Sequence, residues 1–217
     1  MVNGKNRSSI HHLPLTNLEV QTLRAEEVIE RFRRTGALLE GHFILSSGLH
    51  SAVYLQCALV LQHPAEAESF GLALAERFQD QRIETVASPA IGGLIIGYEV
   101  ARHLDARFIW TERDPEGHMT LRRGFTVRPG ESILVVEDVI TTGGSTRETI
   151  ETLRGAGARV VGAASIIDRS SGRADVGLAR IALATLDVPS VAPSACEACA
   201  RGEQAVKPGS RKTVRGQ

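Results

Sequence analysis

The 217-residue sequence has no excess charge of either sign, because 25 lysines and arginines balance 25 aspartates and glutamates. This balance gives no general support for binding to nucleic acid or membranes. No stretch reaches the roughly 18 apolar residues of a membrane span, and the start, MVNGKNRSSIHHLPL, lacks the apolar centre of a signal peptide. Three cysteines, an odd number, do not indicate a secreted disulfide framework. We therefore expect a cytoplasmic protein without nucleic-acid or membrane partners.

Internal repeats and low-complexity segments are also missing, and the length suits one α/β domain with short appendages. The expected strands are ETVASP, RFIW, SILVVED, RVVGAASIID and RIALATL, and they alternate with the helical segments GGLIIGYEVARHL and STRETIETLRGAG. Such alternation predicts right-handed β-α-β crossovers and a mainly parallel sheet flanked by helices.

The stretch ILVVEDVITTGGST, residues 133–146, combines two carboxylates with glycines and hydroxyl side chains. Glu137 and Asp138 follow a buried strand, where ionised groups cost free energy unless they are paired or solvated. Ligands of an open parallel sheet bind beyond the carboxyl ends of its strands. The following turn enters a helix whose first N–H groups suit a phosphate, and the carboxylates suit ribose hydroxyls or a hydrated cation. We therefore predict a sugar-phosphate site rather than an ordinary strand-turn-helix.

Two better-known phosphate motifs are absent from this stretch. It has neither the G-x-x-x-x-G-K-[ST] spacing of a P-loop nor the G-x-G-x-x-G spacing of a dinucleotide site. Ser145 and Glu148 have the spacing of a capping box, which predicts that the helix begins at Ser145.

VVEDVITTGGST closely resembles the phosphoribosyl-pyrophosphate signature of the type I phosphoribosyltransferases. Other segments resemble the orotate branch of this family: GHFILSSGLHSAVYLQ its N-terminal hood, SPAIGGLIIG its pyrophosphate loop, TERDPEGHMTLRRGF its mobile catalytic loop and IIDRSSG its base-side loop. The resemblance implies the fold of that family, a parallel sheet flanked by helices with a small N-terminal hood. It also implies transfer of the 5-phosphoribosyl group from phosphoribosyl pyrophosphate to orotate, giving orotidine 5'-monophosphate and pyrophosphate in pyrimidine (UMP) biosynthesis.

The chain then divides into four expected parts. Residues 1–16 are a flexible tail, and residues 17–63 hold an N-terminal helix, which begins at the capping motif TNLE, and the hood segment. Residues 64–190 form the phosphoribosyltransferase core, whose first helix begins at Pro64. Residues 191–217 are a C-terminal tail.

The resemblance assigns catalytic roles to Glu137 and Asp138, which would hold the ribose hydroxyls. Phosphoribosyl pyrophosphate would also contact the rest of the signature and the pyrophosphate loop, namely Val139, Ile140, Thr141, Thr142, Gly143, Gly144, Ser145, Ala90, Ile91, Gly92 and Gly93. The alternative for the glycines of that loop is packing of a helix on a strand. Mg²⁺ would arrive with the substrate and have no direct side-chain ligands.

On the base side, the resemblance places Arg169, Tyr54 and Thr141 against orotate. An arginine fork suits a carboxylate such as that of orotate. The alternatives are a surface pair of Arg169 with Asp168 and a core position for Tyr54.

The charged segment from Thr111 to Gly124 would be the mobile loop, with Arg113 and His118 as catalytic residues. Two lysines of the best-known members are missing, and Arg122 and Arg123 would supply the positive charge toward phosphoribosyl pyrophosphate instead. The alternative for this arginine pair is a solvated turn. We expect the arginines of the loop to be unpaired without an anion, and the loop to close over the neighbouring site of a homodimer.

The motif CEAC, with Cys196 and Cys199, has the spacing of half a zinc site. Cys57 is the only other cysteine, so a metal site would need a partner subunit or histidines. We favour unligated thiols in a flexible tail.

Two other functions are compatible with the signature. One is a purine or xanthine phosphoribosyltransferase, against which the hood and the segment around Arg169 argue. The other is a non-catalytic regulator that senses nucleotides on the same fold.

Overall fold

The computed structural model describes residues 23–45 and 47–208. The tail expected at residues 1–16, the helix start expected at TNLE and residues 209–217 lie outside the described part of the chain.

A six-stranded sheet forms the centre of the chain, with the strand order β5-β4-β3-β6-β7-β8. Its strands are β3 (Thr85–Pro89), β4 (Arg107–Arg113), β5 (Met119–Leu121), β6 (Ser132–Ile140), β7 (Arg159–Asp168) and β8 (Arg180–Thr185). All neighbouring strands are parallel except β4 and β5, which pair antiparallel. The sheet is therefore mainly parallel, as predicted, and the carboxyl ends of β3, β6 and β7 lie at the same end of it.

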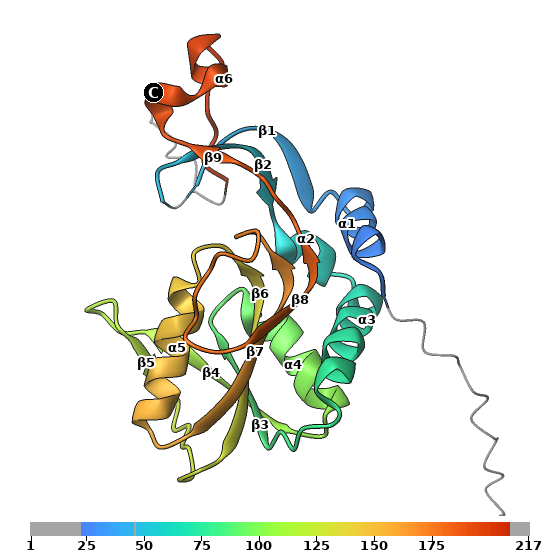
Figure 1. Ribbon diagram of the computed structural model, residues 1–217, viewed down its shortest axis with the longest axis vertical. Coiled ribbons are helices and arrows are strands. Elements are labelled where there is room, and N and C mark those ends of the chain that lie inside the picture. The colour runs from blue at the N-terminus through green and yellow to red at the C-terminus, as the bar shows by residue number, and fades with distance from the viewer. Residues whose placement is uncertain (1–22, 46, 209–217) are drawn as a thin grey trace, which may run out of the picture.

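Helices cover both faces of this sheet (Figure 1). Successive strand residues point to opposite faces, so Val86 and Val136 belong to one apolar core while Ala87 and Val135 belong to the other. The helices are α1 (Ala25–Arg34), α3 (Pro64–Ala75), followed by the short helix η1 (Glu76–Phe78), and α4 (Gly93–His103) on the first face, and α5 (Gly144–Gly155) on the second. Among the helices in the described part of the chain, none is long and apolar enough to cross a membrane.

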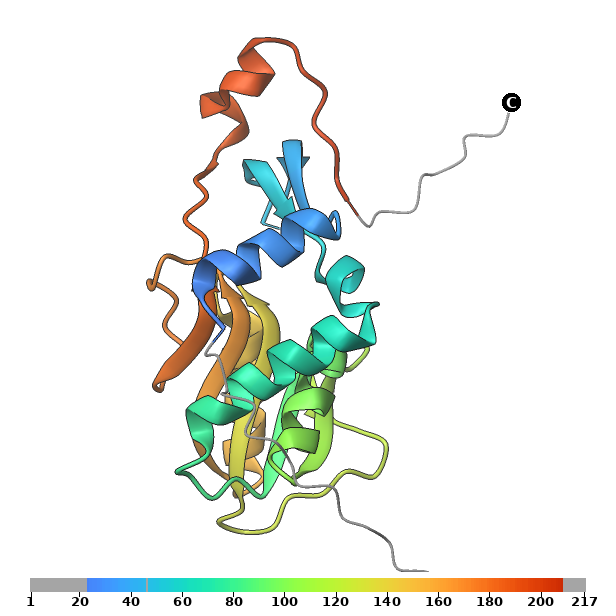
Figure 2. The same ribbon diagram turned by 90° about the vertical axis from the view of Figure 1, so that its right-hand side faces the viewer.

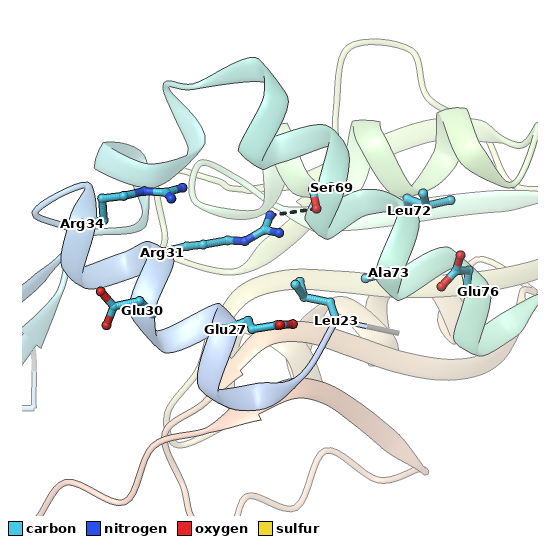
Figure 3. Close-up of a pocket in the computed structure, with 9 residues that line it drawn as sticks. All are labelled: Leu23, Glu27, Glu30, Arg31, Arg34, Ser69, Leu72, Ala73 and Glu76. Atoms are coloured by element: carbon cyan, nitrogen blue, oxygen red, sulfur yellow. Dashed lines mark hydrogen bonds between the residues drawn. The ribbon is translucent and has the colours of Figure 1, made fainter. Parts of the chain in front are cut away.

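Two arginines hold the first helix on α3, and one of them, Arg34, pairs with Glu66 through its Nη2 at 2.5 Å. Arg31 points from α1 toward α3, and its Nη1 donates to Ser69 Oγ at 2.8 Å and to Glu66 Oε2 at 3.1 Å (Figure 3). A shallow pocket of about 340 Å³ lies between the two helices at this point. Its lining contains none of the predicted site residues, so we treat it as part of the contact between α1 and α3.

A second, three-stranded sheet forms the hood. Its strands are β1 (Leu38–Ile44), β2 (His50–Leu55) and β9 (Ser190–Val191) in that order, and both pairs are antiparallel. The short helix α2 (Cys57–Leu61) links the hood to α3. The hood lies beyond the carboxyl end of the six-stranded sheet, so it covers the place where ligands of such sheets bind (Figures 1 and 2).

Residues 190–208, called the C-terminal segment below, pass over the hood. After β9 they form the short helices η2 (Pro193–Ala195) and α6 (Glu197–Ala200). Val206 then exchanges backbone hydrogen bonds with β1, donating to the His42 carbonyl and accepting from the Ile44 N–H, both at 2.8 Å. This part of the chain is paired with the hood, so the flexible tail expected around the two cysteines is wrong for residues 190–208.

Candidate active site

The carboxylates Glu137 and Asp138 lie near the carboxyl end of β6. The strand is fully buried from Ser132 to Val136 and half-buried at the two carboxylates, where it emerges beneath the hood. The Thr146 hydroxyl donates to Glu137 Oε2, and the backbone N–H of Val139 donates to Asp138 Oδ1 at 2.8 Å. Both groups are thus fixed in place by neighbours on β6 and α5.

Burial changes the acidity of both carboxylates. It raises the pKa of Glu137 to about 7, and the charge of Asp138 adds to this effect while the Thr146 hydroxyl opposes it. Burial also raises the pKa of Asp138, against the hydrogen bonds from Val139 and from the Cys57 thiol. Such carboxylates are unfavourable as bare anions, and hydroxyl donors or a cation on a ligand would satisfy them.

The turn after β6 is shaped by Gly143. Its φ of 77° is in the left-handed region, and a Cβ on it would lie 2.8 Å from Val176 Cγ1. α5 begins at Gly144, with Gly143 as its N-cap and no capping side chain within the described residues. The predicted capping box of Ser145 and Glu148 is therefore wrong, because the tight turn starts the helix one residue earlier. The Gly144 N–H donates to Thr142 Oγ1 at a long 3.4 Å, and the Gly143 N-cap has no side chain that could bond the N–H groups that follow, which suits an anion.

The predicted pyrophosphate loop, Ala90 to Gly93, lies directly against this strand end. A Cβ on Gly92 would come within 2.8 Å of both oxygens of Asp138. A Cβ on Gly93 would meet Ser88 Cβ and the Val136 carbonyl oxygen, each at 2.9 Å. Gly93 thus serves the packing of α4 on the sheet, which was the alternative for this loop, whereas Gly92 brings the backbone close to the catalytic carboxylate.

A cavity of about 910 Å³ opens between the hood and the carboxyl ends of β6 and β7. It is lined by residues of both sheets, including Tyr54, Asp138, Val139, Thr141, Thr142 and Arg169 from the predicted site and Arg147, Arg173, Ser190, Lys207 and Pro208 in addition. The additional residues could not be predicted from the sequence motifs, because three of them come from the C-terminal segment. The cavity is large enough for a nucleotide-sized ligand.

Arg169 connects the core to the hood across this cavity. Its Nη2 donates to Ser51 Oγ at 2.6 Å and to the Val53 carbonyl at 3.0 Å. Burial lowers the pKa of its guanidinium, against the influence of Tyr54 nearby. A half-buried arginine in a ligand-sized cavity suits an anionic group on the ligand.

These features agree with the comparisons to known proteins. A family model described as "Phosphoribosyl transferase domain" matches residues 58–177. A curated orotate phosphoribosyltransferase from Pelotomaculum thermopropionicum is 54% identical over 187 residues, covering 86% of this chain and 98% of that protein. A curated orotate phosphoribosyltransferase from Thermotoga maritima is 50% identical over 186 residues, covering 86% and 97%. The chain belongs to the orotate phosphoribosyltransferase family.

A solved structure supports the same assignment. The crystal structure of orotate phosphoribosyltransferase from Aeropyrum pernix matches with a TM-score of 0.63 and 28% identity, covering 73% of this chain and 93% of that one. The predicted fold class, that of the type I phosphoribosyltransferases, is therefore confirmed. The curated matches do not favour the purine or xanthine alternative, and they identify the chain with a family of enzymes rather than regulators.

Within this orotate phosphoribosyltransferase fold, Asp168 does not pair with Arg169. Asp168 Oδ2 lies 2.8 Å from Arg180 Nη1, and Ser170 donates to Oδ1 through both its N–H and its hydroxyl. Burial would raise the pKa of Asp168, but these hydrogen bonds hold it below its usual value. The alternative of a surface pair between Arg169 and Asp168 is thus excluded.

Tyr54 is half-buried in β2, where it lines the cavity and also contacts Phe43 with ring centroids 5.8 Å apart. Tyr54 therefore has one side toward the cavity, as a residue that covers the base would, and another side packed against Phe43, as a core residue would.

The predicted mobile loop forms a hairpin in this structure. β4 extends to Arg113, and β5 returns antiparallel along it at the edge of the sheet. Arg113 lies 2.8 Å from Glu148 on α5, and Arg123 Nη2 donates to Glu112 at 3.1 Å. Arg122 reaches the same Glu112 at 4.0 Å. The expectation that these arginines are unpaired without an anion is therefore wrong.

The hairpin also does not line the cavity of its own chain. β5 is separated from β6 by β4 and β3, which corresponds to about 14 Å at the usual strand spacing. Arg113, His118, Arg122 and Arg123 are thus not brought together with Glu137 and Asp138 within one chain.

Sequence reasoning missed one neighbour of the Asp138 carboxylate. Cys57, the first residue of α2, is buried and its thiol donates to Asp138. Burial and the charge of Asp138 raise the pKa of this thiol well above its ordinary value. No sequence motif joins a cysteine of the hood region to a carboxylate 81 residues later, since only folding brings them together.

Proposed function

We propose that the chain transfers the 5-phosphoribosyl group of phosphoribosyl pyrophosphate to orotate in the cavity beneath the hood. The observation that carries this proposal is the grouping of three elements in one place. Asp138 of β6, Thr141 and Thr142 of the turn before α5, and Arg169 all line the same 910 Å³ cavity. The products are orotidine 5'-monophosphate and pyrophosphate, as implied by membership of the orotate phosphoribosyltransferase family.

Glu137 and Asp138 hold the ribose hydroxyls in this proposal. Their half-buried carboxylates accept hydrogen bonds from a ligand that carries several hydroxyl groups. The 5'-phosphate binds at the residues from Thr141 to Ser145, where backbone N–H groups and hydroxyls converge and the helix dipole favours an anion. The narrow turn at Gly143 supports this role, because it leaves the helix N-terminus without a capping side chain.

The leaving pyrophosphate lies along the loop from Ala90 to Gly93. The contact of Gly92 with Asp138 supports this position, because it puts the loop beside the sugar site. Mg²⁺ fits here as an ion carried by the substrate, since the nearest donors are two carboxylates and the remaining ligands would be phosphate and hydroxyl oxygens. When bound, it neutralises charge on the pyrophosphate.

Orotate lies under the hood, with its carboxylate toward Arg169 and its ring near Tyr54 and Thr141. In the reaction, the ring nitrogen bonds to the anomeric carbon of the sugar while the bond to pyrophosphate breaks through an oxocarbenium-like state. The residues of this chain act by holding the two reactants in line and by stabilising charge, because no covalent intermediate is needed.

The active form in this proposal is a homodimer in which the hairpin of one subunit completes the cavity of the other. The position of Arg113 and His118 outside their own cavity supports this arrangement. An exposed apolar strip, formed by Ile91 (83% exposed), Ile95 (46%) and Tyr98 (58%), supports association of two copies beside the site.

A mixing experiment tests the exchange of hairpins. Subunits with Asp138→Asn are combined with subunits carrying Arg113→Ala and Arg123→Ala, and exchange is verified by native mass spectrometry. If the hairpin acts in the neighbouring site, activity should reach about one quarter of the wild-type value, because half of the dimers are mixed and each has one intact site of two. No activity after verified exchange would contradict the proposal.

The activity itself is tested one base at a time. Purified protein is incubated with phosphoribosyl pyrophosphate, Mg²⁺ and either orotate, adenine, guanine, hypoxanthine or xanthine, and pyrophosphate release is measured. We expect release with orotate alone. Turnover of a purine at a similar rate, or no turnover of any base, would overturn the proposed reaction.

A further inference from the structure

Four side chains of the types that bind metals meet between the hood and α6. The helix α6 lies beyond the hood, on the side away from the six-stranded sheet (Figure 1). The four residues are His42 on β1, His50 at the start of β2, Cys196 just before α6 and Cys199 within α6. Their ligand atoms all lie within 4.8 Å of one another. Three of the four side chains are buried and Cys199 is half-buried, so the group is an interior cluster rather than a surface patch.

The spacings within this cluster are those of a tetrahedral site. His42 Nε2 lies 2.8 Å from His50 Nδ1, and the nitrogen-to-sulfur distances are 3.3, 3.4 and 3.6 Å. A tetrahedral zinc ion with usual bond lengths has its ligands about 3.3 Å apart for two nitrogens and about 3.6 Å apart for nitrogen and sulfur. Among these four distances, only that between the two nitrogens would need to grow, by about 0.5 Å, to admit the ion. The remaining two pairs lie within 4.8 Å and can adjust to the ion.

The outer hydrogen bond of His42 sets its orientation. Its Nδ1 lies 3.0 Å from the Glu203 carbonyl oxygen, which can only accept, so Nδ1 carries the proton. The lone pair of Nε2 then points into the cluster. A ligand histidine held in this way by a backbone carbonyl is a usual feature of zinc sites.

We propose that His42, His50, Cys196 and Cys199 bind one structural zinc ion. Two thiolates and two imidazoles in tetrahedral geometry select zinc over magnesium or calcium, which prefer oxygen ligands. Four protein ligands leave no open position, so the ion has a structural role. The site is separate from the proposed transferase reaction and does not depend on it.

The ion would join the hairpin of β1 and β2 to a segment that lies about 150 residues later in the sequence. It connects β1 and β2 to α6, beside the backbone pairing of Val206 with β1. The same C-terminal segment contributes Ser190, Lys207 and Pro208 to the wall of the cavity. Zinc therefore holds one wall of the cavity in place without contacting the substrates.

Metal content of the full chain tests the proposal. The protein is expressed without a histidine tag in zinc-supplemented medium, purified under reducing conditions and analysed by mass spectrometry of its metals. We expect about one zinc per chain, falling to roughly one tenth or less in the double variant Cys196→Ser/Cys199→Ser and in His42→Gln. The matched controls Cys57→Ser and His63→Gln, which remove a thiol and an imidazole outside the cluster, should keep their zinc.

A second measurement does not depend on the folding of the variants. Wild-type protein is stripped with a chelator and digested briefly with trypsin, with and without added Zn²⁺. Zinc should protect Arg201 and Lys207 from cleavage and raise the melting temperature, and replacement by Co²⁺ should give the visible bands of a tetrahedral thiolate site.

The proposal is overturned by any of three results. The first is reduced protein that takes up no stoichiometric zinc. The second is zinc retained by the double cysteine variant. The third is a disulfide between Cys196 and Cys199 in the freshly isolated chain, which would leave no thiolates for the metal.

Discussion

The segment from Glu137 to Ser145, called the turn below, and the hood both border the cavity. They differ in the sequence distance between the residues that form them. From Glu137 to Ser145, the turn uses nine consecutive residues. The hood, by contrast, pairs β2 with β9 and brings Cys196 to His42, 154 residues apart. The turn could therefore be recognised as a sequence motif. The N-terminal part of the hood was also predicted from the sequence, but the contribution of β9 and the C-terminal segment to it appears only in the strand pairing.

The two parts should also respond differently to substitution. In the proposed mechanism the turn acts directly on the sugar and phosphate, so changes there should reduce turnover. The hood and Arg169 are proposed to act on the base, so changes there should alter selectivity between the two substrates. Four predictions, from the largest expected effect to the smallest, test this difference.

Replacement of Asp138 by asparagine should have the largest effect. It removes an acceptor of charge-assisted hydrogen bonds at the ribose, which corresponds to a loss of roughly 10- to 150-fold in kcat. The fold should persist, because a half-buried charge is removed rather than introduced. Steady-state kinetics and circular dichroism measure both quantities, with the exposed Asp80→Asn as control. Wild-type turnover in Asp138→Asn would contradict the role given to the turn.

Arg169→Ala should separate the two substrates. We expect KM for orotate to rise about tenfold or more, because an arginine that faces a carboxylate is lost, while KM for phosphoribosyl pyrophosphate changes little. Initial rates with each substrate varied in turn give both constants. Arg82→Ala, at the opposite end of the strands, is the control. An equal rise for both substrates would show that Arg169 acts through the hood contacts to Ser51 and Val53 alone.

Gly143→Ala should destabilise the turn by about 1–3 kcal/mol through its left-handed φ and the clash with Val176. Gly130 has nearly the same φ, 75°, but nothing lies within 4 Å of its added Cβ. Gly130→Ala should therefore cost only about 1 kcal/mol, which isolates the contribution of the clash. Thermal melts compare the two, at about 2–4 °C per kcal/mol for a chain of this size. Equal melting temperatures would mean that the clash relaxes freely.

The pH dependence of stability should give the smallest effect. The pKa of Glu137 is raised to about 7 in the folded chain, so its protonated form favours folding. Its stabilisation is complete below its unfolded pKa, near 4.5, and is lost as the pH rises through 7. Relative to Glu137→Gln, the ligand-free wild type should lose at most roughly 3 kcal/mol between these limits, and less to the extent that solvent screens the half-buried carboxylate.

Chemical denaturation of both proteins at several pH values measures this difference. The subtraction is necessary because Asp168 and Glu131, whose pKa values are lowered, contribute with the opposite sign. A constant difference across the pH range would mean that the pKa of Glu137 is the same in the folded and unfolded chains.

Local pattern accounts for most of what the sequence could predict. The strands of the core follow apolar runs, and Pro64 begins α3 as expected, because these features depend on neighbouring residues. The start of α5 was misplaced by one residue, because Ser145 has the sequence signal of a capping residue. In the structure the helix begins at Gly144, after a turn at Gly143 where a side chain would clash with Val176.

The remaining errors concern partners that are distant in sequence. Arg113 and Arg123 find Glu148 and Glu112 only after β4 and β5 pair, so composition alone made them look unpaired. The spacing of Cys196 and Cys199 is typical of half a zinc site, but it does not indicate which other residues would complete the site, because it describes only residues close in sequence. The sequence showed that histidines or a partner subunit would be needed. Nothing in the sequence around His42 and His50 indicated that these two histidines lie beside the cysteines.

The late position of β9 in the chain has a consequence for the order of folding. β1 and β2 leave the ribosome early, yet their third strand and the contact of Val206 with Phe43 come from the last 30 residues of the sequence. Contacts between residues so far apart are slow to form, and synthesis proceeds from the N-terminus. The six-stranded core can assemble on the nascent chain before residues 190–206 are made, whereas the hood closes only after they have been made. Release of a chain that ends before Ser190 would therefore leave an exposed hairpin edge and an open cavity.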